Sequence, residues 1–132
     1  MSKVVTISEA ASLAIHAMVL IARSGQSVNV THIAQRMGAS RNHLAKVMQR
    51  LVKDGFVKST RGPAGGFVLN KNPEDITLLS IYESIEGPIE LSGCPLAHKV
   101  CAIGQCLMEG VIGEATALVI NHFAQKRLSD LL

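Results

Sequence analysis

The chain has 132 residues, the length of one ordinary domain; 48% of them are hydrophobic and 17% are charged, with a net charge of +3. This composition is that of a globular chain with its own core, and it excludes a disordered protein. With one Tyr, three Phe and no Trp, an aromatic stacking surface for single-stranded nucleic acid or carbohydrate is not expected.

No apolar run approaches the roughly 20 residues that a membrane-spanning helix needs. The longest, Ala10 to Ala22, is interrupted by Ser12 and His16. The chain shows no secretion signal at its beginning, and three cysteines, an odd number, do not make a disulfide framework. We therefore expect a cytoplasmic protein without a membrane partner.

Positive charge is concentrated in the first half of the chain. Residues 1–70 contain nine Lys or Arg against two acidic residues, a net charge of +7, whereas residues 71–132 have a net charge of −4. Seven of the nine basic residues lie between Arg36 and Arg61. Such a field attracts a polyanion, although a charge cluster can also be a solvated face that keeps a protein soluble.

Hydrophobic periodicity predicts three helices in this half. The first covers about residues 9–24 and the second covers Val30–Met37, with Asn29 or Thr31 as its N-cap. A third helix is predicted from Ser40 to Gly55. Its apolar stripe consists of Leu44, Val47, Met48, Leu51 and Val52. Nearly all its other positions carry hydrogen-bond donors, so this helix has a cationic polar face suited to the major groove of DNA.

Two short strands, 56–60 and 67–69, are predicted next, joined by a turn with three glycines and a proline. A short helix, a glycine turn, a longer basic helix and a glycine-rich hairpin occur in the order of a winged helix-turn-helix. Such a fold can also serve protein contacts, but the basic face favours DNA. The fold class that we predict is mainly α, with a small β-hairpin wing.

The winged helix-turn-helix predicts a role for each polar position along it. The first turn of the third helix offers Ser40, Arg41, Asn42 and His43 to bases or phosphates, with Ser40 expected to cap the helix. Phosphate contacts are expected from Lys46, Arg50, Lys53 and Lys58. At the hairpin tip, Arg61 suits a narrow minor groove, while glycines allow close approach of the backbone to DNA: Gly62, Gly65 and Gly66.

The second half is predicted to contain two more helices separated by a loop over residues 88–104. The first runs from Thr77 to about Glu86, and a longer one runs from about Gln105 to Phe123. One face of the longer helix carries Leu107, Val111, Ala115, Leu118 and His122. We divide the chain into a DNA-binding region, residues 1–72, and a loop and dimerisation helix, residues 73–132, within one compact domain.

Three cysteines, Cys94, Cys101 and Cys106, lie within thirteen residues. Three thiols this close can converge on one inorganic centre, and as soft ligands they favour an iron–sulfur cluster, zinc or copper. They can also be three unrelated cysteines, one or two of them buried. No cysteine has an obvious neighbouring base with an orienting carboxylate, so an enzyme with a cysteine nucleophile is not supported.

Five motifs resemble, in order, those of the Rrf2 family of winged helix-turn-helix regulators. They are Ser40-Arg41-Asn42-His43-Leu44, Asp54-Gly55-Phe56-Val57, the turn from Arg61 to Phe67, Ile76-Thr77 and Ile85-Glu86-Gly87-Pro88. The resemblance covers essentially the whole chain. It implies a homodimer built around the long C-terminal helix and bound to a palindromic operator in double-stranded DNA. The family includes iron–sulfur regulators of the IscR and NsrR type, and also members without a cofactor.

The resemblance also implies that the three cysteines hold an iron–sulfur cluster, 2Fe-2S or 4Fe-4S, with one position left for another ligand. Glu109 lies about where IscR-like proteins place a histidine ligand, and His98 lies inside the loop. In other relatives the last ligand comes from the first helix of the partner subunit, where Ser12 and His16 correspond. His16 is the preferred candidate, although in an apolar run a buried hydrogen bond is an alternative. The position can also be open to nitric oxide or oxygen.

Together these features predict a dimeric transcriptional repressor that senses redox state, nitric oxide or iron–sulfur status. Two alternatives keep the DNA-binding fold. In one, zinc or reactive thiols replace the cluster; in the other, the regulator has no cofactor and is controlled by a partner protein.

Overall fold

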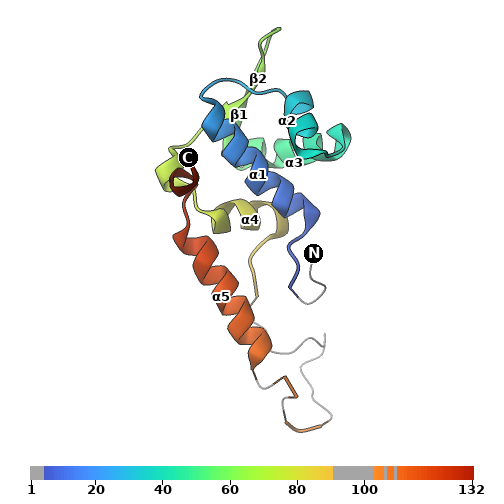
Figure 1. Cartoon of the computed structure of the whole chain (residues 1–132), viewed down its shortest axis with the longest axis vertical. Helices are drawn as coiled ribbons and strands as arrows, with labels where there is room; N and C mark the ends of the chain where they lie inside the picture. The colour runs from blue at the N-terminus through green and yellow to red at the C-terminus, as the bar shows by residue number, and fades with distance from the viewer. Residues whose placement is uncertain (1–4, 91–102, 106, 109) are drawn as a thin grey trace.

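The computed structural model of the protein describes residues 5–90, 103–105, 107–108 and 110–132. A two-stranded hairpin projects beyond the first three helices at one end of the molecule, and the last long helix extends toward the other end (Figure 1). The predicted fold class, mainly α with a small β wing, is therefore confirmed. Among the described residues, no helix is both long and apolar enough to span a membrane.

The first three helices begin where a side chain caps them. Helix α1 (Glu9–Ser24) is capped by Ser8, α2 (Val30–Met37) by Asn29, and α3 (Arg41–Lys53) by Ser40. In each, a side-chain oxygen accepts a hydrogen bond from a backbone N–H of the first turn, which is otherwise without a partner. Left-handed glycines end α1 and α2, as predicted.

The hairpin is packed against the segment that joins α1 to α2. Strands β1 (Val57–Thr60) and β2 (Gly66–Leu69) pair antiparallel, with Val57 opposite Leu69. Phe67 of β2 also exchanges two backbone hydrogen bonds with Val28, at 3.1 and 2.8 Å. The wing is therefore fixed to the helix-turn-helix as well as to itself.

Gly66 makes this close packing possible. A Cβ at position 66 would lie 2.5 Å from the carbonyl carbon and oxygen of Val28 and 2.7 Å from the backbone nitrogen of Asn29. These atoms are backbone and cannot rotate away. We expect Gly66→Ala to destabilise the protein by about 1–3 kcal/mol, the usual cost of an overpacked site. The thermal unfolding temperature measures this, and Ala64→Gly in the exposed turn is the control. An unchanged melting temperature for Gly66→Ala would contradict the packing.

One hydrophobic core runs through both halves of the chain. Most of the predicted stripe of α3 is buried in it, but Val52 is 37% exposed and lies outside it. Residues from the second half join the same core: Ile76, Leu78, Ile81 and Leu128. The two regions divided at residue 72 thus share their apolar interior.

The second half contains a short 3₁₀ helix, η1 (Pro73–Asp75), then α4 (Leu78–Glu86), α5 (Val111–Gln125) and a last 3₁₀ helix, η2 (Leu128–Leu131). The predicted α4 is confirmed, with a capping box at Thr77. The long helix begins at Val111 and not near Gln105, because Gly110 has the left-handed φ of 79° that breaks a helix. Leu107 therefore lies outside α5.

Residues 126–131 pack back against α1 and the segment before α4, which the sequence does not predict. The backbone of Leu128 donates to the carbonyl of Ile76 at 2.8 Å, and Leu78 donates to the carbonyl of Lys126 at 3.0 Å. Leu128 is fully buried, and the Arg23 guanidinium donates to the carbonyl of Leu131 at 2.7 and 3.0 Å. These contacts hold η2 against the core.

Candidate nucleic-acid interface

The first turn of α3 presents the predicted contact residues at the surface. Ser40 caps the helix, its hydroxyl accepting from the backbone N–H of His43 at 3.4 Å. Arg41 and Asn42 are exposed, His43 is half-buried and Lys46 is exposed one turn further on. The Ser40 hydroxyl is thus engaged within the helix. Arg41 and Asn42 are therefore the side chains of this turn that are free to contact DNA.

The exposed basic residues of the hairpin lie next to a part of it that hydrogen bonds hold in place. Thr60 Oγ1 accepts from the backbone N–H of Gly66 at 3.0 Å and lies 3.1 Å from Ser27 Oγ, which joins the base of the wing to the segment before α2. Arg61 is exposed in the turn beyond this base, and Lys58 is exposed on β1. Neither Arg41 nor Arg61 has a hydrogen bond or ion pair within the described residues, so both guanidinium groups are available.

The glycines of the turn have reasons internal to the protein. A Cβ at Gly65 would lie 2.5 Å from the carbonyl oxygen of Thr60, and Gly66 faces Val28 in the same way. Gly62 has a φ of 103° with open space around it. The prediction that these glycines let the backbone approach DNA remains open. All three positions favour glycine without any DNA: Gly65 and Gly66 because a Cβ would collide with backbone, and Gly62 because of its positive φ.

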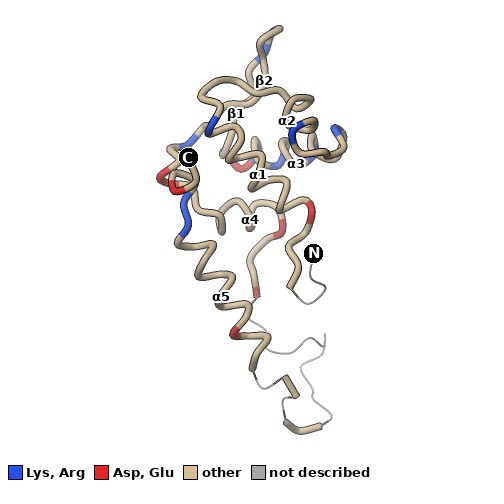
Figure 2. The backbone as a smooth tube through the Cα atoms, in the orientation of Figure 1, with Lys and Arg blue, Asp and Glu red and all other residues tan. Residues whose placement is uncertain are grey.

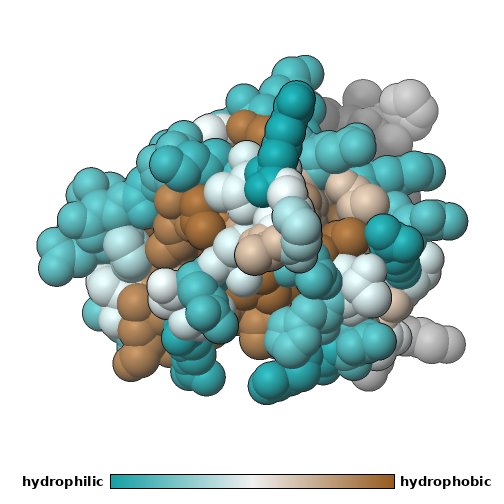
Figure 3. Space-filling model, turned by 90° about the horizontal axis from the view of Figure 1, so that it is seen from above, coloured by the Kyte–Doolittle hydropathy of each residue, from teal (hydrophilic) through white to brown (hydrophobic). Residues whose placement is uncertain are grey.

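The basic side chains of the first half gather at the end of the molecule that carries the wing. Figure 2 shows most of the Lys and Arg on the hairpin, α2 and α3, whereas acidic residues predominate toward α4 and α5. Seen from the wing, hydrophilic residues surround the hairpin and hydrophobic ones show in patches between them (Figure 3). The charge asymmetry of the sequence is thus an asymmetry in space.

Arg50 is engaged differently from the other predicted contact residues. Its Nε donates to the carbonyl of Ser84 in α4 at 2.8 Å and lies 3.4 Å from Oδ2 of Asp54. Sequence reasoning missed Asp54 and Ser84. One signal was present: Leu78, Ile81 and Ser84 follow one another at three-residue steps, so a serine stands where the periodicity expects an apolar residue.

Helix α5 has an uncovered apolar surface. None of its fifteen described residues is buried in the single chain, and the large side chains of Val111 and Leu118 are 53% and 73% exposed. Its contact with the body is made through α4, where the rings of Phe123 and Tyr82 are 5.9 Å apart. An uncovered apolar helix of this length marks an interaction surface.

The predicted cofactor ligands Cys94, Cys101, Cys106, His98 and Glu109 lie outside the described residues. Within the described part of the chain, no group of three His, Cys, Asp or Glu side chains is placed to hold a metal ion. A test of the cysteine ligands must therefore be chemical.

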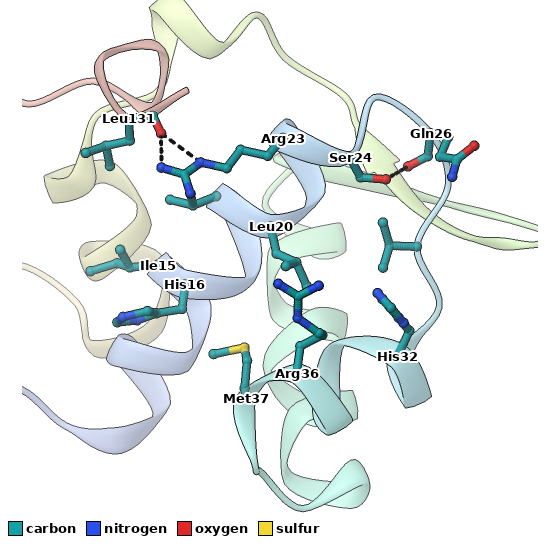
Figure 4. Close-up of a pocket in the computed structure, with 12 residues that line it drawn as sticks. Ile15, His16, Leu20, Arg23, Ser24, Gln26, His32, Arg36, Met37 and Leu131 are labelled. Carbon is teal, nitrogen blue, oxygen red and sulfur yellow. Dashed lines mark hydrogen bonds between the residues drawn. The ribbon is translucent and has the colours of Figure 1, made fainter.

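The two candidate ligands on α1 are described. His16 is exposed and not buried in an apolar run, since the helix turns it away from the core, and its Nδ1 lies 2.7 Å from the carbonyl oxygen of Ser12. Ser12 is half-buried. His16 lines an open cavity of about 780 Å³ between α1, α2 and η2, into which the side chains of His32 and Arg36 also extend (Figure 4). The imidazole is therefore accessible from outside the chain.

A capped basic helix after a short helix and a tight turn, followed by a fixed and positively charged hairpin, defines a winged helix-turn-helix protein. The family model described as "Rrf2: Iron-dependent Transcriptional regulator" matches residues 7–132. The chain therefore belongs to the Rrf2 family of transcriptional regulators, which bind DNA and are not enzymes.

Individual relatives agree with this assignment. The chain is 33% identical to the HTH-type transcriptional regulator NsrR of Bacillus subtilis (strain 168), over 83% of this chain and 77% of that protein. The structure of CymR, the global cysteine regulator of B. subtilis, matches with a TM-score of 0.77 and 26% identity, over 96% of this chain and 95% of that one. IscR of T. potens matches with a TM-score of 0.74 and 25% identity, over 96% and 85%.

Proposed function

We propose that this regulator binds a palindromic operator as a homodimer and that an iron–sulfur cluster held by Cys94, Cys101 and Cys106 controls its binding. The observation that supports this cofactor is the set of sulfur ligands. Three thiols lie within thirteen residues, in a family described as iron-dependent. Thiolates are the ligands that iron–sulfur clusters take, so the residues fit the group. When bound, the cluster would supply a centre that oxidants, nitric oxide or loss of iron alter.

The exposure of the polar side chains supports a set of proposed contacts with DNA. Arg41 and Asn42 at the start of α3 would contact base edges, and Arg61 would enter the minor groove. Lys46 and Lys58 would contact phosphates, and such contacts supply affinity rather than sequence specificity. The homodimer is supported by the exposed apolar residues of α5. Two copies of α3 then have to span about one turn of DNA, roughly 34 Å.

The chain connects the cysteines to both of these surfaces. The segment that carries them follows α4, which contacts α1 and α3, and precedes α5. The exposed His16 on α1 is our candidate for a ligand supplied by the partner subunit. Through these connections, the state of the cysteine segment can bias how two DNA-binding halves are held relative to each other. On this reading the protein is a repressor that responds to redox state, nitric oxide or iron–sulfur status.

Anaerobic purification tests this proposal. We expect a reddish-brown protein containing iron and sulfide, and loss of its visible absorption in Cys94→Ala, Cys101→Ala and Cys106→Ala. Chelator treatment should change the affinity for operator DNA by about 5- to 150-fold, the usual range of coupling between two sites. Wild-type iron content in all three variants would contradict the ligand assignment. Equal affinities before and after chelation, at equal salt, would contradict the sensing role.

A second candidate is a regulator whose thiols act without iron. The likeness to CymR favours it, because CymR is the global cysteine regulator of B. subtilis. A colourless anaerobic preparation whose DNA binding responds to thiol oxidation would support this candidate in place of the first.

A further inference from the structure

The last turns of α3 and α4 are joined by a network centred on a buried serine. Among the described residues, Ser84 is the one polar residue that is buried, at 7% exposure. Its hydroxyl donates to Oδ2 of Asp54, and its carbonyl accepts from Nε of Arg50 at 2.8 Å. Arg50 and Asp54 are themselves 3.4 Å apart, one helical turn from each other. All three residues therefore bond to one another.

This network determines what Arg50 is able to do. The Nε of its guanidinium is directed at a main-chain carbonyl of another helix, in a geometry that the flexible ammonium of lysine does not reproduce. Its side chain is 50% exposed, and that of Asp54 is 32% exposed. A carboxylate beside the guanidinium also offsets the charge that a phosphate would otherwise attract. Arg50 thus differs from Lys46, which is exposed and has no such partner within the described residues.

We propose that Arg50, Asp54 and Ser84 position α3, the helix that presents Arg41 and Asn42, on α4, and that Arg50 supports DNA binding through this network and not through a phosphate contact. Helix α3 has thirteen residues and is about 20 Å long. The network holds its C-terminal end, whereas Arg41 and Asn42 lie at its N-terminal end. A tilt of about 5° about the held end moves the other end by about 1.7 Å, enough to break a hydrogen bond to a base.

Two kinds of DNA contact respond differently to such a tilt. Contacts to base edges depend on position to a fraction of an ångström, whereas phosphate contacts depend mainly on the number of charges nearby. Loss of the network should therefore lower affinity for the selected sequence while leaving non-specific affinity and its salt dependence unchanged. Loss of a phosphate contact lowers both affinities and reduces the salt slope by about 0.9.

The experiment compares four variants with the wild type on two DNA probes. One probe is a duplex that the wild-type protein selects from a random-sequence pool, and the other is a scrambled duplex of the same composition. Binding is measured over a range of salt concentrations. Arg50→Lys keeps the charge and removes the Nε geometry, Ser84→Ala removes the hydroxyl, and Asp54→Asn keeps an acceptor for it. Lys46→Ala is the matched control for a phosphate contact.

We expect Arg50→Lys and Ser84→Ala to bind the selected duplex about 5- to 10-fold more weakly, with the scrambled duplex and the salt slope unaffected. Asp54→Asn should lose less, and Lys46→Ala should lose affinity for both probes along with part of the slope. Wild-type affinity in Arg50→Lys would overturn the proposal. So would an equal loss on both probes in Ser84→Ala, because a partly unfolded protein weakens binding to any DNA and the network would then serve stability alone.

Discussion

Replacing Arg41 and Arg61 together with glutamate should abolish retention of duplex DNA in a gel. Both guanidinium groups are exposed and have no partner within the described residues, at the start of α3 and in the turn of the wing. Reversing two charges per subunit changes the charge facing the DNA by eight in a dimer, and each lost phosphate neutralisation weakens binding further as salt rises. We expect affinity to fall at least about a hundredfold near physiological salt.

Lys126→Glu is the control for this charge reversal. Lys126 lies just after α5, on the acidic half of the chain, and the substitution alters net charge by the same amount per site. Its affinity for the duplex should stay within about threefold of the wild type, because a charge more than a Debye length from the DNA is largely screened. If the double variant retained DNA as the control does, the basic helix and wing would not be the DNA-binding surface.

Leu118→Glu should convert the proposed homodimer to a monomer. Leu118 is 73% exposed in the single chain and lies on a helix that has no buried residue among those described. If two copies of α5 cover each other, the substitution buries a carboxylate at the interface, where an unpaired charge is costly. Light scattering should then report the mass of one chain. Operator affinity should fall at least about a hundredfold, because one half-site supplies only half of the contacts.

The control lies on another side of the same helix. Ala124 is exposed and is about 120° around the axis from Leu118, so Ala124→Glu should leave a dimer. A dimer in Leu118→Glu would show that α5 has a different partner. A monomeric wild type would remove the homodimer from the proposed function altogether.

Sequence patterns predicted the elements that have local signals. Helices α1 to α4 begin and end within a residue or two of the predicted positions, because Ser40, Asn29 and Thr77 cap them and Gly25 and Gly38 stop two of them. Both strands end at the predicted residue, but β1 begins one residue later than predicted and β2 one residue earlier. Capping and left-handed turns are properties of a few adjacent residues, so a single sequence contains them.

The start of α5 and helix η2 lack such signals. Apolar residues continue the helical period back to Leu107, but Gly110 takes a left-handed conformation that periodicity does not reveal. Helix η2 has four residues and is held by backbone pairing with Ile76 and by the burial of Leu128, both of which depend on the tertiary fold. The sequence thus predicts α5 but misplaces its start, and it does not predict η2.

In the candidate site, too, local patterns predict some residues and miss the contacts between distant ones. The exposed positions Arg41, Asn42 and Arg61 follow from the helix and turn that carry them. The engagement of Arg50 does not, because its partner Ser84 is thirty-four residues away in the chain and meets it only in the packed protein. His16 was placed in an apolar run by its neighbours in sequence, whereas helical rotation turns it outward. Contacts between distant residues are the part that local patterns omit.

The lack of burial along α5 has a consequence for how the protein folds. A fifteen-residue helix is only marginally stable by itself in water, so most of its free energy has to come from whatever covers it. If a second subunit is that cover, folding of this helix and association become one equilibrium. The unfolding temperature should then rise with protein concentration. In a newly made chain at low abundance, the wing and the core would fold before helix α5 becomes stable.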